Sequence, residues 1–140
     1  MTRTELVAFI RRHRWGVVST VAASGAPQAA VVGVAVTDDL ALVFDTLDST
    51  RKAQNLRRDP RAAIVVGWDE EQTVQCEGVA DEPAGAELAG CQRAYFARFP
   101  DGPTRLVWPG ITYFRVRPRW IRFSDFRGPQ PSIEEVPVGR

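Results

Sequence analysis

The sequence is poor in the residues that most often carry out catalysis or bind metals. Its 140 residues include one histidine, one methionine and two cysteines, and these do not form the spacings of metal sites. It also lacks a Gly-x-Ser-x-Gly segment, a Walker loop and a Gly-x-Gly-x-x-Gly segment after a strand. We therefore expect no metal site and assign no catalytic residue, so a bound cofactor would have to supply any redox chemistry.

The few reactive side chains are isolated from one another. His13 lies at the basic end of the first predicted helix, away from carboxylates and cysteines, which indicates an exposed or half-packed residue. Cys76 and Cys91 are far apart, which favours buried small side chains over a disulfide. The acidic pairs 38–39 and 70–71 fall in predicted turns, where solvation explains paired carboxylates.

Long hydrophobic runs and a strong net charge are also missing. The apolar segment Leu6–Ile10 is brief and runs into arginines, so it predicts neither a signal peptide nor a membrane span, and we expect a cytoplasmic protein. The net charge is +1, which provides no field to attract nucleic acid or anionic lipid. We therefore expect neither a nucleic-acid nor a membrane partner.

Short apolar runs separated by turn residues dominate the rest of the sequence. Together with 44% hydrophobic residues, they indicate one domain over residues 1–128 and a loose C-terminal tail over 129–140. Strands without regular helix alternation favour an antiparallel barrel with helices at its ends. Helices are predicted at 2–14, 50–58 and 84–99, and strands at 15–22, 28–36, 40–46, 61–67, 72–81, 111–117 and 120–124.

The segment Leu40–Gly67 reads as strand, short basic helix and strand. Asp48 or Ser49 is the predicted N-cap of the helix, and Arg51 and Lys52 fall in its first turn. A helix N-terminus is already positive, so cations there predict a bound anion such as phosphate, with a solvated surface pair as the alternative. Lys52 is the only lysine among 18 Lys and Arg residues, which points to a need for a compact charge.

These residues resemble the pyridoxamine 5′-phosphate oxidase-like, FMN-binding split-barrel family. The matching motifs are Phe44-Asp45-Thr46, Ser49-Thr50-Arg51-Lys52, Asp59-Pro60 and the hydrophobic strand Ala62–Val66. A looser likeness extends over residues 6–125. The resemblance implies a mainly β fold, a six- to seven-stranded antiparallel split barrel with flanking helices.

The resemblance also implies a site. Arg51 and Lys52 match the family's ligands of the FMN phosphate, Asp45 and Thr46 match the strand end that faces the flavin, and 30–33 match the strand along the isoalloxazine edge. Gly33 either lets a flat ligand approach the backbone or serves packing. The predicted cofactor-binding residues are Ala30, Val31, Val32, Gly33, Asp45, Thr46, Ser49, Arg51 and Lys52.

In the family, two barrels pair and the flavin lies between subunits, so a homodimer is implied. Trp108, Tyr113 and Trp120 are candidates for that interface, and the intramolecular core is the alternative.

Departures from the family pattern affect the expected substrate. Ala30 and Ala35 replace a basic phosphate ligand and a substrate-facing lysine, and the C-terminal motif with its arginine and histidine is missing. We therefore predict an FMN-dependent oxidoreductase that acts on an unknown small organic substrate rather than on pyridoxamine phosphate. The alternatives are a deazaflavin-dependent reductase, whose anionic tail would use Arg57, Arg58 and Arg61, and a non-enzymatic flavin or haem carrier or sensor.

Overall fold

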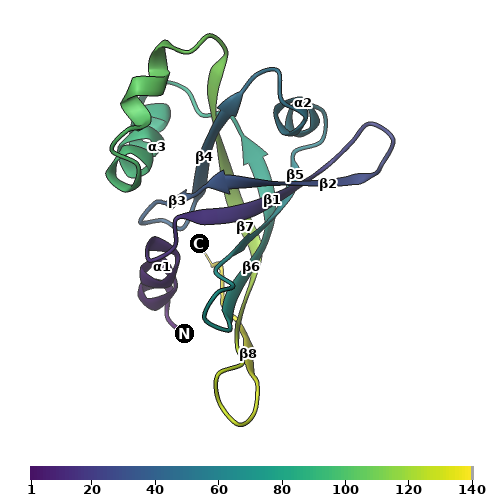
Figure 1. Cartoon of the computed structure of the whole chain (residues 1–140), viewed down its shortest axis with the longest axis vertical. Coiled ribbons are helices and arrows are strands. Elements are labelled where there is room, and N and C mark those ends of the chain that lie inside the picture. The colour runs from purple at the N-terminus through teal and green to yellow at the C-terminus, as the bar shows by residue number, and fades with distance from the viewer. Residues whose placement is uncertain (140) are drawn as a thin grey trace.

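Strands dominate the computed structural model, which describes residues 1–139. Over these residues the chain forms α-helices, one 3₁₀-helix and eight strands (Figure 1). The helices are α1 (Arg3–Arg11), α2 (Arg51–Arg58) and α3 (Gly85–Arg98), followed by the 3₁₀-helix η1 (Gly102–Val107). The strands are β1 (Trp15–Val21), β2 (Pro27–Gly33), β3 (Ala35–Val36), β4 (Leu42–Leu47), β5 (Arg61–Val66), β6 (Gln72–Asp81), β7 (Ile111–Asp125) and β8 (Ser132–Glu135).

All strand pairs are antiparallel, and the sheet follows the order β2-β1-β5-β6-β7-β4-β3, with β8 pairing with β7 beside this path. β2 and β3 occupy opposite ends of the path although only Val34 separates them along the chain. The sheet therefore has to curl until its ends meet, which produces a partly open barrel. The predicted mainly β split barrel with flanking helices is confirmed.

The segment Gln28–Val36 forms two strands, not the single strand that we predicted. β2 pairs with β1, whereas β3 pairs with β4. Between them, the N–H of Val34 donates to the carbonyl of Arg14 at 3.2 Å. Gly33 lies against the ring of Phe99, because a Cβ at this position would lie 2.7 Å from that ring. Packing against Phe99 therefore explains this glycine.

The strands predicted on either side of Pro118 are one continuous strand, β7. Gly78 of β6 pairs with Pro118 and Glu77 pairs with Trp120, so the register shifts at this point. Such a bulge accommodates a proline, which has no N–H for the sheet ladder. Because β7 is not interrupted, it pairs with β4, β6 and β8.

The prediction of a loose tail is wrong for residues 132–136. β8 pairs with the end of β7, and the next residue, Val136, is only 4% exposed and belongs to the main core. The N–H of Val136 donates to the carbonyl of Ile121 at 2.9 Å, and the amino group of Met1 lies 2.9 Å from Glu134. This segment is therefore docked against β7 and the main core. Residue 140 lies outside the described residues.

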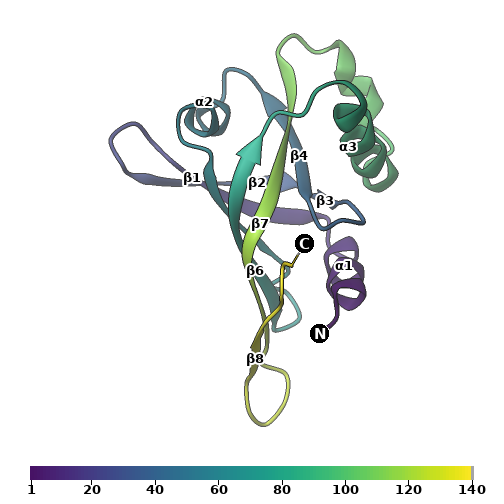
Figure 2. The ribbon, with the colours of Figure 1, turned by 180° about the vertical axis from the view of Figure 1, so that it is seen from behind.

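α1 and α3 lie on one side of the barrel and α2 on the other, as the two opposite views agree (Figures 1 and 2). The main core fills the barrel, and a smaller cluster lies under α3. Cys91 of α3 is buried as predicted, and Tyr95 and the C-cap residue Phe99 are buried with it. α1 ends at Arg11, earlier than predicted, and η1 occupies a segment predicted as a loop. Over residues 1–139, no helix has the length and apolar character to cross a bilayer.

Candidate functional site

The first turn of α2 lies where β4 ends. Thr50 is its N-cap, not Asp48 or Ser49 as predicted, and its hydroxyl accepts a hydrogen bond from the N–H of Ala53 at 3.3 Å. The same hydroxyl lies 3.0 Å from the hydroxyl of Thr46, on β4. This contact ties the helix start to the strand end, which confirms the predicted placement of Arg51 and Lys52 in the first helical turn.

A cavity of about 350 Å³ opens between this helix start and the strands β1 and β2. It brings together four of the predicted site residues, Ala30, Ser49, Arg51 and Lys52. Its full lining is Val18, Thr20, Gln28, Ala29, Ala30, Ser49, Thr50, Arg51 and Lys52. The lining contains two cationic side chains and no carboxylate, so the cavity has an uncompensated positive charge.

The charge balance differs sharply along α2. Within residues 1–139, Arg51 and Lys52 form no ion pair, and burial lowers the pKa of the Lys52 ammonium below its ordinary value of 10.5. Arg57, five residues after Lys52, is paired with Asp48 at 2.6 Å and with Glu82 at 2.7 Å. An ammonium that is half-buried without a counter-ion is costly, and an anion in the cavity would remove that cost.

Three polar side chains that we did not single out from the sequence fix the position of α2. The amide of Asn55 donates to the hydroxyl of Thr20 at 3.0 Å and to the side-chain oxygen of Gln28 at 2.9 Å. α2 is therefore bonded to β1 and β2, the opposite wall of the cavity. The sequence did contain a signal for Asn55. It lies three residues after Lys52, so the two side chains lie close to the same face of the helix.

The predicted residues 30–33 do not act as one group. Ala30 lines the cavity and Val31 is 62% exposed next to it, whereas Val32 is buried in the main core. Gly33 is covered by Phe99. Only the first part of this segment therefore borders the cavity.

Asp45 points away from the cavity. Neighbouring strand residues face opposite sides of a sheet, so Asp45 and Thr46 cannot share one environment. The carboxylate of Asp45 accepts hydrogen bonds from the hydroxyl of Tyr95 on α3 and from Nε of Arg105 on η1, each at 2.9 Å. The prediction of a site residue at Asp45 thus falls on a cluster beneath α3, outside the cavity lining.

The remaining reactive residues lie elsewhere. His13 is packed against the ring of Phe9, with its Nδ1 3.9 Å from Asp69, and it does not line the cavity. Cys76 and Cys91 are free thiols and buried, as predicted. Over the described residues, no group of three His, Cys, Asp or Glu side chains is placed to hold a metal ion.

The three aromatic residues considered for a subunit interface have different environments. Tyr113 is buried in the cluster under α3, so the core interpretation holds for it. Trp120 is half-buried, and its Nε1 donates to Glu135 at 2.7 Å. Trp108 is half exposed at the end of η1, next to the exposed Leu106 and Val107. Trp108 is therefore the most accessible of the three.

The lining residues give the cavity a definite chemical character. Two cations, three hydroxyl-bearing residues and a helix N-terminus converge there, an arrangement suited to a phosphate or another compact anion. The lining contains no histidine, carboxylate or thiol that could move a proton or attack a substrate. This chain's own side chains can therefore bind and position a ligand in the cavity, and the reactive group has to come from the ligand.

Known proteins resemble this chain in sequence and in fold. The family model for pyridoxamine 5′-phosphate oxidase matches residues 2–125. A pyridoxine/pyridoxamine 5′-phosphate oxidase from Bordetella pertussis is 32% identical over 119 residues, which cover 81% of this chain and 55% of the relative. The chain thus spans about half the length of the curated relatives that it matches.

Solved structures with this fold differ in what their names say they bind. A heme binding protein from Mycobacterium smegmatis superposes with a TM-score of 0.81 at 22% identity, covering 96% of this chain and 58% of the other. A pyridoxamine 5′-phosphate oxidase-related, FMN binding protein from Nostoc punctiforme has a TM-score of 0.68 at 15% identity, covering 96% and 94%. At these identities the structural likeness shows the fold alone. The family match extends over most of the sequence, and the chain therefore belongs to the pyridoxamine 5′-phosphate oxidase family.

Proposed function

We propose that the cavity at the start of α2 binds the phosphate end of FMN. The observation that carries this proposal is the unpaired positive charge of Arg51 and Lys52 at a helix N-terminus, inside a cavity of about 350 Å³. Ser49 and Thr50 add hydroxyl groups to the same wall. Charge-assisted hydrogen bonds of this kind each contribute about 1.5–3 kcal/mol to binding or stability.

The residues around the cavity also fit the flavin ring of FMN. β2 borders the cavity with small side chains, Ala29 and Ala30, and the neighbouring Val31 presents an exposed apolar surface. A flat aromatic ring needs apolar walls of this type. Bound FMN would supply hydride or electron transfer, and the chain's part is to hold the phosphate, orient the cofactor and exclude water.

We further propose that the chain is an oxidoreductase for a small organic substrate other than pyridoxamine phosphate. The departure at Ala35 supports this, because an alanine in place of the substrate-facing lysine cannot bind an anionic substrate group. Ala35 is also buried against the cluster under α3, so its side chain faces the protein interior.

The deazaflavin alternative receives less support from the charge distribution. Arg57 and Arg61, which would serve an anionic tail, already form ion pairs with Asp48 and Asp59, each at 2.6 Å. Arg58 donates to the carbonyl of Val21 at 2.6 Å. These three arginines already bind protein groups, whereas Arg51 and Lys52 form no ion pair within residues 1–139.

A haem carrier is supported by the name of the Mycobacterium smegmatis relative of this fold. The position of His13 argues against haem ligation at the α2 cavity. His13 is the only histidine of the chain, and it does not line that cavity. FMN therefore remains the better proposal for this site.

A homodimer is also part of the proposal. Exposed apolar side chains lie on β2 at Val31 and around η1 at Leu106, Val107 and Trp108. A second copy that covered these side chains would bury apolar surface and could complete the cofactor site. Sedimentation velocity of the purified chain measures the oligomeric state, and a monomer at micromolar concentration would contradict the dimer.

The cofactor proposal is tested by spectroscopy and by matched ligands. We expect the purified protein to show a flavin absorbance spectrum and to release FMN on heating, whereas a Soret band would favour haem. Calorimetric titration of the cofactor-free protein should then give at least about tenfold tighter binding of FMN than of riboflavin, which lacks only the phosphate. Equal affinities for the two would contradict the phosphate site.

A further inference from the structure

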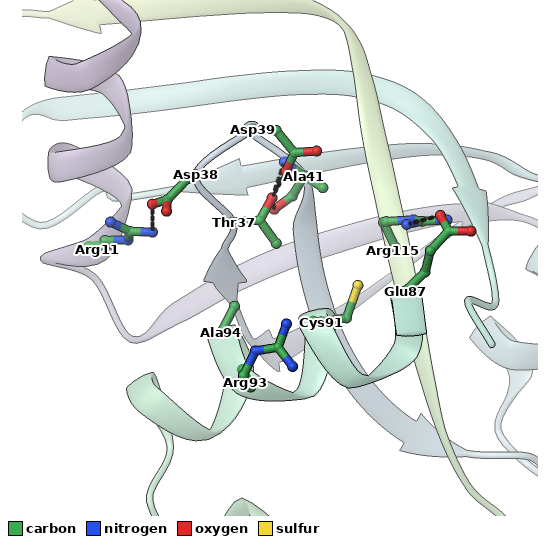
Figure 3. A pocket seen from close by; sticks show the side chains of 11 residues that line it. Arg11, Thr37, Asp38, Asp39, Ala41, Glu87, Cys91, Arg93, Ala94 and Arg115 are labelled. Atoms are coloured by element: carbon green, nitrogen blue, oxygen red, sulfur yellow. Dashed lines mark hydrogen bonds and ion pairs between the residues drawn. The ribbon is translucent and has the colours of Figure 1, made fainter. Parts of the chain in front are cut away.

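A second cavity lies on the opposite side of the barrel from α2. It has a volume of about 450 Å³ and opens between the end of α1, the turn that joins β3 to β4, and α3. Figure 3 shows the side chains that line it. The proposed FMN site does not use any of these residues.

The charged side chains of this cavity are of both signs, and most are already neutralised. Arg11 pairs with Asp38 at 2.9 Å on one side of the space, and Arg115 pairs with Glu87 at 2.9 Å on the other (Figure 3). Asp39 and Arg93 remain. Within residues 1–139, neither forms an ion pair. Both side chains are exposed, so among the described residues one anion and one cation of the lining have no ionic partner.

Asp39 and Arg93 lie on facing walls. Asp39 belongs to the β3–β4 turn and Arg93 to α3, and Figure 3 shows them on opposite sides of the space. The hydroxyl of Thr37 donates to Asp39 and accepts a hydrogen bond from the N–H of Ala41 at 2.9 Å, which holds the turn in place. Two opposite charges that are held apart cannot neutralise each other directly.

Small residues lie on the surface between the two charges. Ala41 and Cys91 are buried there, and Gly90 and Ala94 add little bulk. A smaller, mainly apolar cavity of about 190 Å³ shares Arg11 and Ala94 with this one and lies toward β3. A hydrocarbon chain would contact these small side chains and the apolar lining of the smaller cavity.

We propose that this cavity binds a small zwitterion whose cationic and anionic groups are separated by a short hydrocarbon chain. Asp39 would receive the cationic group, and Arg93 would hold the anionic group with its planar fork of donors. The salt bridges at either side set the limits of the site without competing for the ligand. The proposed ligand is thus an amino acid whose ammonium and carboxylate groups are separated by several methylene groups, or a molecule with the same arrangement of charges.

Matched probes test the charge pattern. Titration calorimetry with 6-aminohexanoate, hexanoate and hexylamine varies the charges while the hydrocarbon chain stays nearly constant. We expect 6-aminohexanoate to bind at least about tenfold tighter than either singly charged analogue, the change that loss of one charge-assisted contact gives. Glycine, whose charges are adjacent, should bind more weakly. Absence of 6-aminohexanoate binding, or equal binding of all probes, overturns the proposal.

Variants test the two residues. Asp39→Asn and Arg93→Gln should each weaken binding of 6-aminohexanoate at least about tenfold and leave FMN binding unchanged. Glu70→Gln and Arg12→Gln remove the same types of charge from exposed positions outside the cavity and should leave the affinity unchanged. Circular dichroism of each variant checks that the fold is retained. If all four variants bind like the wild type, the assignment of Asp39 and Arg93 is wrong.

Discussion

Asp45 on β4 and Arg105 on η1 form an ion pair in which Oδ2 and Nε are 2.9 Å apart, with side chains only 14% and 16% exposed. The hydroxyl of Tyr95 on α3 donates to the other oxygen of the same carboxylate at 2.9 Å. Burial, and then the charge of Asp45, raise the pKa of the Tyr95 hydroxyl, so this hydroxyl stays a donor. One carboxylate therefore ties both α3 and η1 to the barrel.

Removal of this carboxylate should destabilise the fold. Asp45→Ala leaves the guanidinium of Arg105 and the hydroxyl of Tyr95 without their acceptor, and we expect a loss of about 2–3 kcal/mol in the free energy of unfolding. Urea denaturation measures it. Asp101→Ala is the matched control, because it removes the exposed second partner of Arg105 and should cost much less. Similar losses for both variants would contradict the importance of the buried pair.

Phosphate binding should depend on the two cations at the start of α2. Arg51→Ala and Lys52→Ala should each weaken FMN binding at least about tenfold, because each removes a charge-assisted contact. Arg61→Ala, a control on a cation paired with Asp59, should leave the affinity nearly unchanged. Fluorescence titration measures all three. A change of less than about threefold for Arg51→Ala and Lys52→Ala would show that the phosphate lies elsewhere.

The pH dependence of FMN binding should report on Lys52. Burial lowers the pKa of this ammonium, so in the free protein it loses its charge at a pH below its ordinary value of 10.5. Only the charged form attracts phosphate, and FMN affinity should therefore fall as the pH rises through that pKa. Lys52→Arg should keep its affinity to higher pH, because a guanidinium stays protonated. Identical alkaline profiles would contradict this role, since ionisation of the flavin itself affects both proteins equally.

The Cys76 thiol should be inert in the folded protein. Burial raises its pKa to about 12, so at pH 8 the reactive thiolate is only ~10⁻⁴ of the total. We expect iodoacetamide to leave Cys76 unmodified in the native protein and to modify it after unfolding in urea. Mass spectrometry of the Cys91→Ser variant isolates this residue, and rapid labelling under native conditions would contradict its burial.

The C-terminal segment should contribute to stability through Val136. This side chain is 4% exposed in the main core, whereas Ile133 on the same segment is 52% exposed. We expect Val136→Ala to lower the free energy of unfolding by about 1–3 kcal/mol, because it removes two buried methyl groups and leaves a cavity. Ile133→Ala should change it by less than about 0.5 kcal/mol. Equal effects in urea denaturation would mean that the segment is not docked in solution.

Local patterns in the sequence were sufficient for much of the fold. Alternating apolar residues and turn signals predicted the β1–β2 and β5–β6 hairpins, because pairing across a short turn involves neighbours in sequence. Local patterns also predicted a helix at 84–99, and α3 occupies Gly85–Arg98. The same local information placed Arg51 and Lys52 in the first turn of α2.

Only the tertiary structure decided which distant residues meet. The partner of Asp45 is Arg105, 60 positions away, so the sequence could not show that this carboxylate belongs beneath α3. The hydrogen bonds of Asn55 to Thr20 and Gln28, which position the cavity walls, likewise depend on how the sheet curls.

The sequence by itself determined the local elements and the charge at the start of α2, because turn chemistry and periodicity act over a few residues. The exchange of strand partners at Val34, the docking of β8 and the facing charges of Asp39 and Arg93 were decided by tertiary structure. These features depend on the closure of the barrel, which sets contacts between segments that no local pattern relates to one another.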